Sequence, residues 1–561
     1  MRAEGETDAA DSRRFFFPRP LSLTLAFALG AATVAGYAPY YLFPVPVFTL
    51  AGLFYLWLRA PGPRAAASVG FAFGLGLFLF GVSWVYVSLH DFGAMPMPLA
   101  AAATFLFCAF LALFPAMVGY ACARFKMPTA VRFGVLAPAA WMLAEWIRSW
   151  IFTGFPWLAL GYSQIPSSLL AGYAPVLGIH GVSLVTAASA GLLAAWWLTE
   201  VEKDKGGTVS WDFEERARAR SSQQTPDAIQ GGGPGALTRA EQRTRLKSLL
   251  INPASLMLAC LWLGGYALKQ IEWTDPVGAP VKVSLLQGNV PQDLKWREDR
   301  VLATLETYRA LARLSTSQLM VLPETALPLF LKQVPRGYLD ELATHARKNG
   351  GDILIGVPEL LPSGEYFNSL ISYGTEPSQI YRKSHLVPFG EFIPLRPVLG
   401  WIVSILAIPL QDFSRGGENQ RPLAVAGQRV AVNICYEDAF GEEIIRQLPE
   451  ATLLVNVSNV AWFGRTIAPG QHLQISQARA LETGRYMLRA TNTGVTGVIG
   501  PDGRLLGAAP EFTIATVTHR VRGYSGSTPY VRWGNHAALA LCFVLIAAAA
   551  WLKRRSARSA A

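Results

Sequence analysis

The chain has 561 residues, of which 52% are hydrophobic and only 16% are charged, which is too apolar for a soluble protein of this length. Its net charge of +11 comes mostly from a few basic segments, so it does not indicate nucleic-acid binding. The apolar residues gather in stretches near the length of about 20 residues that crosses a bilayer as a helix. Eight such stretches are predicted, at about 21–38, 41–58, 67–89, 98–122, 133–159, 169–198, 249–267 and 535–552.

The basic residues alternate along the chain in a way that predicts its orientation. Arginines and lysines occur before the first stretch, after the second and fourth, throughout 199–247, and after the last. The short loops near 38–40 and 90–97 contain none. Under the positive-inside rule, both termini are then cytoplasmic, and 199–247 is a cytoplasmic insertion. The region that follows seven spans is predicted to lie on the outer face of the membrane.

These boundaries divide the chain into five parts. Arg13 and Arg14 resemble a twin-arginine signal, but they are interpreted as part of an uncleaved anchor because six further spans follow the first. The predicted parts are a cytoplasmic N-terminus (1–20), a membrane domain (21–271), an outer domain (272–530), an eighth span (531–552) and a cytoplasmic tail (553–561).

The outer domain has the pattern of an α/β fold. Short β-branched and apolar runs predict strands, and longer segments between several of them predict helices. The predicted strands are Val281–Leu286, Leu319–Leu322, Asp352–Ile355, Val430–Ile434, Leu453–Val457 and Met487–Thr491. The predicted helices lie near 297–314, 337–349, 439–447 and 470–485. About 250 residues of this kind suit one large layered domain.

Cys435 is the one cysteine outside the apolar stretches; the others are Cys108, Cys122, Cys260 and Cys542. It ends a β-branched run and precedes an acidic pair that could open a helix. At such a position the thiol is predicted to be exposed, and the helix dipole to favour its thiolate. The alternative is a buried cysteine at a strand end. A disulfide within the outer domain is excluded because the domain has no second cysteine.

Two further polar residues stand at or near strand-like runs. Glu324 follows one such run, and Lys383 lies in a polar segment further along the chain. Because active-site residues of α/β folds gather at strand ends, one cleft could hold both of these residues and Cys435. Glu324 could instead be a helix cap, and Lys383 a solvated charge beside Arg382.

A Cys–His dyad with His385 or His472 is a further alternative. Histidine is the more usual base for a thiol, so spacing does not decide between the two sites. No motif typical of a metal site occurs, and no metal is expected.

The order Glu324, Lys383, Cys435 resembles the Glu-Lys-Cys triad of the nitrilase (carbon–nitrogen hydrolase) superfamily. Within it, several segments resemble signatures of the apolipoprotein N-acyltransferase family. In the outer domain they are Gln287–Gln292 with Trp296, Leu322–Ala326, Lys383–Glu391, Asn433–Glu437 and Ser458–Gly464. In the membrane domain they are Trp146–Arg148, Gly154–Trp157 and Gly161–Gln164. The resemblance covers nearly the whole chain.

The resemblance implies a membrane domain joined to an αββα nitrilase-like sandwich. It implies that Cys435 is the nucleophile, Glu324 the proton acceptor and Lys383 an oxyanion-stabilising residue. An acyl chain would pass from a membrane phospholipid to a thioester, and then to the α-amino group of a diacylglyceryl-cysteine in an apolipoprotein. The implied location is the bacterial inner membrane, with the catalytic domain in the periplasm. No cofactor is expected.

Other residues have supporting roles in this interpretation. Those expected to position the catalytic groups are Glu391, Tyr436 and Glu437, and those expected to line the substrate channel are Trp296, Trp462 and Phe463. The apolar segment 395–413 is either a lid that dips into the bilayer or a core segment. The alternative functions are a membrane-tethered amidase and a transporter or scaffold without catalysis.

Overall fold

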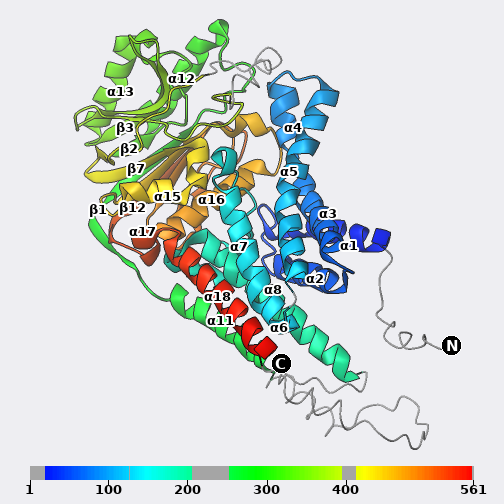
Figure 1. The fold of residues 1–561 in the computed structure, drawn as a ribbon. Helices are drawn as coiled ribbons and strands as arrows, with labels where there is room; N and C mark the ends of the chain where they lie inside the picture. The colour runs from blue at the N-terminus through cyan, green and yellow to red at the C-terminus, as the bar shows by residue number, and fades with distance from the viewer. Residues whose placement is uncertain (1–18, 126, 205–251, 394–411, 559–561) are drawn as a thin grey trace, which may run out of the picture.

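The computed structural model describes residues 19–125, 127–204, 252–393 and 412–558. The proposed lid lies almost entirely outside these residues, as does most of the proposed cytoplasmic insertion. In Figure 1 the helical bundle lies to the right of and below the α/β part, and α18 runs away from the sheets toward the C-terminus. The chain therefore has both the helical part and the α/β part that its sequence predicts.

A helix occurs at each of the eight predicted apolar stretches. These helices are α1 (Arg19–Thr33), α2 (Val45–Arg59), α3 (Pro63–Gly81), α5 (Met97–Arg124), α7 (Ala137–Arg148), α8 (Ala174–Asp204), α11 (Pro253–Lys269) and α18 (His536–Arg558). Within the described residues, five helical segments are long and apolar enough to cross a membrane, whereas α1 and α2 are shorter. The prediction of a multi-pass helical region is confirmed, and the count of eight spans stays a prediction.

The predicted fifth span, 133–159, is wrong at its C-terminal end, because α7 stops at Arg148. The backbone then turns through left-handed conformations at Phe152, Thr153 and Gly154. Arg148 Nη1 donates to the carbonyls of Phe155 and Trp157, at 2.7 and 2.6 Å. Non-helical backbone between apolar helices is tolerated where hydrogen bonds such as these satisfy its polar groups within the protein. The segment 149–159 is therefore an irregular turn, exposed at Trp150 and Phe152 and buried from 156 to 159, and not the end of a span.

The α/β part contains two six-stranded sheets. The first has the order β12-β1-β2-β3-β4-β5 and the second β11-β10-β9-β8-β7-β6. The strands are β1 (Thr274–Gln287), β2 (Leu319–Val321), β3 (Asp352–Leu360), β4 (Tyr366–Gly374), β5 (Ile380–Arg382), β6 (Leu423–Val425), β7 (Gln428–Ile434), β8 (Leu453–Ser458), β9 (Met487–Thr491), β10 (Gly497–Ile499), β11 (Leu505–Ala508) and β12 (Ala515–Gly526). The six predicted strands are all present.

Helices cover the outer face of each sheet. On β1, Leu285 belongs to the core between the sheets, whereas Leu286 packs with α12 (Glu298–Leu314) and α13 (Arg336–Lys348). On β8, Val455 likewise faces between the sheets, and Leu454 packs toward α15 (Gly441–Ile444) and α16 (Ala468–Thr483). This alternation follows from the period of two in a strand. The predicted αββα sandwich is confirmed.

Helix α16 joins the sandwich to the membrane helices. Gln471 Oε1 accepts hydrogen bonds from the indoles of Trp84 and Trp157, at 3.1 and 2.8 Å. Gln474 Oε1 accepts one from the backbone N–H of Ala38, at 2.9 Å. Buried polar groups need such partners, so these amides fix the register between the two parts. The end of β7 that carries Cys435 is thereby held against the helical bundle.

Candidate active site

Cys435 follows directly on β7 and begins a 3₁₀ turn, Cys435–Ala439. Its φ of 55° is left-handed, which is uncommon for a residue with a side chain. The carbonyl of Cys435 accepts hydrogen bonds from Asn456 Nδ2 at 3.1 Å and His472 Nε2 at 3.2 Å. These two contacts support the sharp turn and fix the direction in which the thiol projects.

The predicted stabilisation of a Cys435 thiolate by a helix is wrong. The next helix, α15, has four residues and begins only at Gly441, so it cannot supply a substantial dipole at the sulfur. Cys435 is half-buried, and burial raises the pKa of its thiol. The charge of Glu324 raises this pKa further, and Lys383 opposes it. The thiol is therefore neutral at rest and needs a base.

Glu324 lies three residues beyond the end of β2 and is buried. Its Oε1 accepts a hydrogen bond from Asn368 Nδ2 at 2.7 Å, and its Oε2 accepts one from the backbone N–H of Asn459 at 2.7 Å. Burial opposes ionisation, but Lys383 and these donors outweigh it and hold the pKa of Glu324 below its usual value. Glu324 is thus an ionised buried carboxylate, and its interpretation as an exposed cap is wrong.

Lys383 follows β5 and is 1% exposed. Its Nζ lies 2.9 Å from Glu391 Oε2 and 3.6 Å from Glu324 Oε1. Burial disfavours the ammonium, but Glu391 and Glu324 outweigh it and raise the pKa of Lys383. The neighbouring Arg382 pairs instead with Glu359, at 2.6 Å. Lys383 is therefore a permanently charged buried group and not part of a solvated pair.

Glu391 holds Lys383 in place and is itself held by the loop that carries it. Its Oε2 accepts a hydrogen bond from the backbone N–H of Val387 at 2.9 Å. Its Oε1 accepts one from Asn368 Nδ2 at 3.0 Å. The Asn368 amide therefore bridges Glu391 and Glu324, which keeps two carboxylates apart while both face the same lysine. Asn368 and Asn459 were not predicted to belong to the site.

We expect Asn368→Leu to slow the reaction of Cys435 about 10–100-fold. The substitution removes two hydrogen bonds to carboxylates, each worth about 1.5–3 kcal/mol. Without one of them, the Glu324 carboxylate is held less firmly in its reactive position, which slows the reaction. The rate of Cys435 acylation in purified protein would measure it. Ser369→Ala is a matched control, because the buried Ser369 hydroxyl has no partner among the described residues. Equal rates in the two variants would contradict the bridging role.

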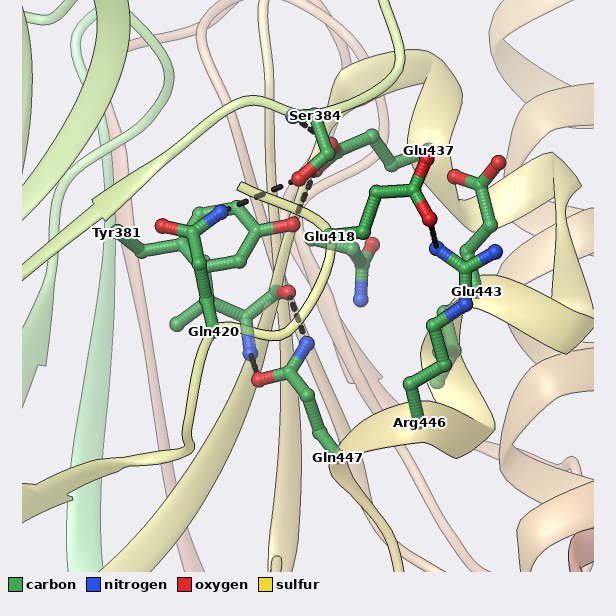
Figure 2. Close-up of a pocket in the computed structure, with 11 residues that line it drawn as sticks. Tyr381, Ser384, Glu418, Gln420, Glu437, Glu443, Arg446 and Gln447 are labelled. Carbon is green, nitrogen blue, oxygen red and sulfur yellow. Dashed lines mark hydrogen bonds and ion pairs between the residues drawn. The ribbon is translucent and has the colours of Figure 1, made fainter. Parts of the chain in front are cut away.

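Glu437 connects the cysteine turn to the lysine segment, as Figure 2 shows. Its Oε1 accepts hydrogen bonds from the backbone N–H groups of Ser384 and His385, at 2.6 and 3.0 Å. Its Oε2 accepts from the backbone N–H of Ile434 at 2.6 Å and from the Tyr381 hydroxyl at 3.0 Å. Burial raises the pKa of Glu437 to about 7. Glu437 therefore braces both loops.

A small pocket opens beside Glu437. Its lining residues are Tyr381, Ser384, Glu418, Gln420, Val432, Asn433, Glu437, Glu443, Ile444, Arg446 and Gln447. None of the three predicted catalytic residues is among them. The pocket is therefore lined by residues of the braced loops and not by the predicted triad.

The described hydrogen bonds of the two candidate histidines do not form a Cys–His dyad. His385 Nδ1 lies 2.8 Å from Glu443 Oε1, and its Nε2 lies 3.0 Å from the carbonyl of Thr153. His472 Nε2 lies 2.7 Å from Asp438 Oδ1 and contacts the backbone oxygen of Cys435. Both rings therefore support the backbone of the site, which favours Glu324 as the base.

The remaining predicted residues are aromatic, and three of them lie where the sandwich meets the helices. The Tyr436 hydroxyl donates to the carbonyl of Gly154 at 2.9 Å. The Phe463 and Trp84 rings are 4.7 Å apart, and the Trp462 and Phe92 rings 6.2 Å apart. Trp296 is partly buried in the loop between β1 and α12. An apolar aromatic wall thus adjoins the cysteine turn.

Two facing sheets, with a buried glutamate, a buried lysine and a half-buried cysteine beyond their strand ends, define a carbon–nitrogen hydrolase domain. The sequence matches the family model of that domain over residues 282–530. Residues 29–192 match the apolipoprotein N-acyltransferase N-terminal domain.

Relatives named apolipoprotein N-acyltransferase match nearly the whole chain. The protein from Nitrosomonas europaea is 51% identical over 94% of this chain and 96% of its own length. Those from Chromobacterium violaceum (42% identical, covering 94% and 93% of the two chains) and Methylococcus capsulatus (41%, covering 96% and 97%) are similar too. The chain belongs to the apolipoprotein N-acyltransferase family.

Proposed function

We propose that this protein transfers a fatty acyl chain from a membrane phospholipid, through a thioester on Cys435, to the α-amino group of diacylglyceryl-cysteine in apolipoproteins. One observation carries the proposal. Lys383 Nζ lies 3.6 Å from Glu324 Oε1, both charges act on the half-buried Cys435 thiol, and the turn that begins at Cys435 packs against the apolar helices. A thiol in this setting suits acyl chemistry on a lipid.

In the first half-reaction, Glu324 accepts the proton of the Cys435 thiol while the sulfur attacks the ester carbonyl carbon. Lys383 and the backbone N–H of Tyr436 stabilise the oxyanion, a contribution of about 3–4 kcal/mol per donor in well-studied enzymes. The tetrahedral intermediate expels the alkoxide, which takes the proton from Glu324. A thioester and a lysophospholipid result.

In the second half-reaction, the amine of the apolipoprotein attacks the thioester carbonyl. Glu324 accepts a proton from the amine nitrogen and returns it to the departing sulfur of Cys435, which restores the free enzyme. The amide product is more stable than either ester, so it draws the sequence forward. This is a ping-pong scheme, and water must be kept from the thioester because hydrolysis would make the enzyme a phospholipase.

The aromatic wall and the charge pattern support a lipid donor on the outer face of a bacterial inner membrane. The rings of Trp84, Trp157 and Phe463 pack on one another, the Trp157 ring also stacks on Tyr436, and apolar groups of this kind exclude water. The positive-inside rule places the sandwich in the periplasm, with both termini cytoplasmic. ATP is absent there, so a lipid ester is a more suitable donor than an activated acyl group made with ATP.

Covalent trapping tests the proposal. The purified protein is incubated in detergent–lipid micelles with alkyne-tagged phosphatidylethanolamine, and the label is located by mass spectrometry. We expect a hydroxylamine-labile acyl group on Cys435 that is absent in Cys435→Ala and is discharged by a diacylglyceryl peptide with a free amine. Discharge by water alone would indicate a lipid hydrolase. No acylation with a competent lipid would reject the proposal in favour of an amidase or a protein without catalysis.

A further inference from the structure

Lys295 is a second buried lysine in the catalytic centre, and the mechanism above does not use it. It lies in the loop between β1 and α12 and is 2% exposed. Its Nζ lies 2.5 Å from Thr325 Oγ1 and 3.3 Å from the carbonyl oxygen of Glu324. Among the described residues, no carboxylate oxygen lies within 4.0 Å of this nitrogen. A buried ammonium without a paired carboxylate is costly, so its presence calls for a function.

The two oxygens that Lys295 contacts belong to a strained turn. Thr325 has a φ of 44°, which is unusual for a β-branched residue. The turn also presses against β3, because a Cβ on Gly356 would lie 2.1 Å from the carbonyl of Pro323 and 2.9 Å from the Cα of Glu324. Lys295 donates to oxygens on both residues of this turn. It thereby holds the backbone from which the Glu324 side chain projects.

The same loop reaches the carboxylate of Glu324 by a second route. Gln292 Oε1 accepts a hydrogen bond from Asn459 Nδ2 at 2.7 Å. The backbone N–H of Asn459 in turn donates to Glu324 Oε2 at 2.7 Å. The loop between β1 and α12 therefore supports Glu324 at its backbone through Lys295 and at its side chain through Gln292.

The charges of the centre balance only when Lys295 is included. Lys383 carries one positive charge, and Glu324 and Glu391 carry two negative charges. A thiolate or an oxyanion would thus form in a site with a negative excess. Lys295 brings the sum to zero, and its charge helps to hold the pKa of Glu324 down. Burial lowers the pKa of Lys295 itself to about 8, with the charge of Glu324 opposing, so the lysine is mostly charged at pH 7.

We propose that Lys295 is a further positioning residue for acyl transfer, whose ammonium holds the Glu324–Thr325 turn and keeps the Glu324 carboxylate ionised as a proton acceptor. The proposal rests on the function proposed above, since it concerns the same glutamate. Lys295 acts through Glu324, because its contacts are with the backbone of Glu324 and the side chain of Thr325.

The test measures the reactivity of the Cys435 thiol without lipid. The full-length protein in detergent reacts with N-ethylmaleimide at a series of pH values, and mass spectrometry of the Cys435 peptide gives the rate. Removing a cation from the centre raises the pKa values of Glu324 and Cys435. We therefore expect Lys295→Met to shift the rate–pH curve toward higher pH by about 1 pH unit or more. Lys282→Met is the matched control, because Lys282 makes the same kind of contact, Nζ to Thr316 Oγ1, at the surface.

An unmoved curve, or a rate that falls by the same factor at every pH, would overturn the proposal, because a structural role alone would lower the rate without shifting its pH dependence. Since alkylation needs no lipid, this result is independent of whether acyl transfer occurs. Should Lys295→Met fail to fold, Thr325→Val and Thr325→Ser decide the matter. The valine removes the oxygen that Lys295 contacts and the serine keeps it, so we expect about 10-fold slower alkylation in the valine variant. Equal rates in the two would also overturn the proposal.

Discussion

Replacing Glu324 with glutamine is expected to slow acylation of Cys435 by about 10²–10⁴-fold, the usual contribution of a positioned general base. The thiol is neutral at rest because burial raises its pKa, so sulfur attack requires a proton acceptor. A glutamine has nearly the same shape but accepts no proton. Its amide would also face one of the two donors, Asn368 Nδ2 or the N–H of Asn459, that now bind the carboxylate. Single-turnover acylation by tagged phospholipid measures the rate.

The control for this experiment is Glu306→Gln. Glu306 lies on α12 in an exposed ion pair with Arg309, at 2.8 Å, so its neutralisation should leave the acylation rate within about twofold of the unmodified protein. Thermal unfolding of both variants separates loss of the base from loss of the fold. If Glu324→Gln acylates as fast as Glu306→Gln while Cys435→Ala remains inert, another group takes the thiol proton, and the role of Glu324 is wrong.

The sequence predicted most of the fold because its signals are local. Alternating β-branched residues predicted β7 and β8, a short strand-like run predicted β9, and the long apolar stretches predicted the helices of the membrane domain. Among the missed strands, β10 and β11 have only three and four residues, which is too short to show a period. β12 does carry the signal, because its buried Val517 and Val521 alternate with exposed polar residues, and the prediction overlooked it. β12 is fixed by antiparallel pairing with β1, about 240 residues away in the chain. The choice of β1 as the partner leaves no local pattern in the sequence, so the pairing could not be predicted.

The positions of the candidate catalytic residues could be predicted, but their environment could not. Placement at strand ends and the resemblance of motifs predicted that Glu324, Lys383 and Cys435 share one site. Their protonation depends on burial and on neighbours far along the chain, which is why the predicted thiolate was wrong. Asn368 reaches Glu324 from 44 residues away, and Lys295 reaches it from a loop without regular structure. Contacts of this kind follow from the closed sandwich and not from any local pattern.

Arg489→Met is expected to give the largest loss of stability. Arg489 lies on β9, is fully buried, and its Nη1 lies 3.1 Å from Asp438 Oδ2, 2.6 Å from Asn456 Oδ1 and 2.9 Å from Ser476 Oγ. Removing one member of a buried ion pair leaves an uncompensated charge and costs about 3–5 kcal/mol of the free energy of unfolding. For a domain of this size the midpoint of thermal unfolding should fall by roughly 10 °C.

The same substitution should impair the site, because Asn456 and His472, which bind the Cys435 carbonyl, depend on the Arg489–Asp438 pair. Acylation should therefore fall even at temperatures where the variant is folded. Arg429→Met is the matched control. Arg429 lies on β7 in an exposed pair with Glu450, at 3.1 Å, which is worth about 0–1 kcal/mol. Adding Asp438→Asn to Arg489→Met removes the stranded charge and should recover part of the stability. If Arg489→Met unfolds at the same temperature as Arg429→Met, the buried pair does not hold the cysteine turn.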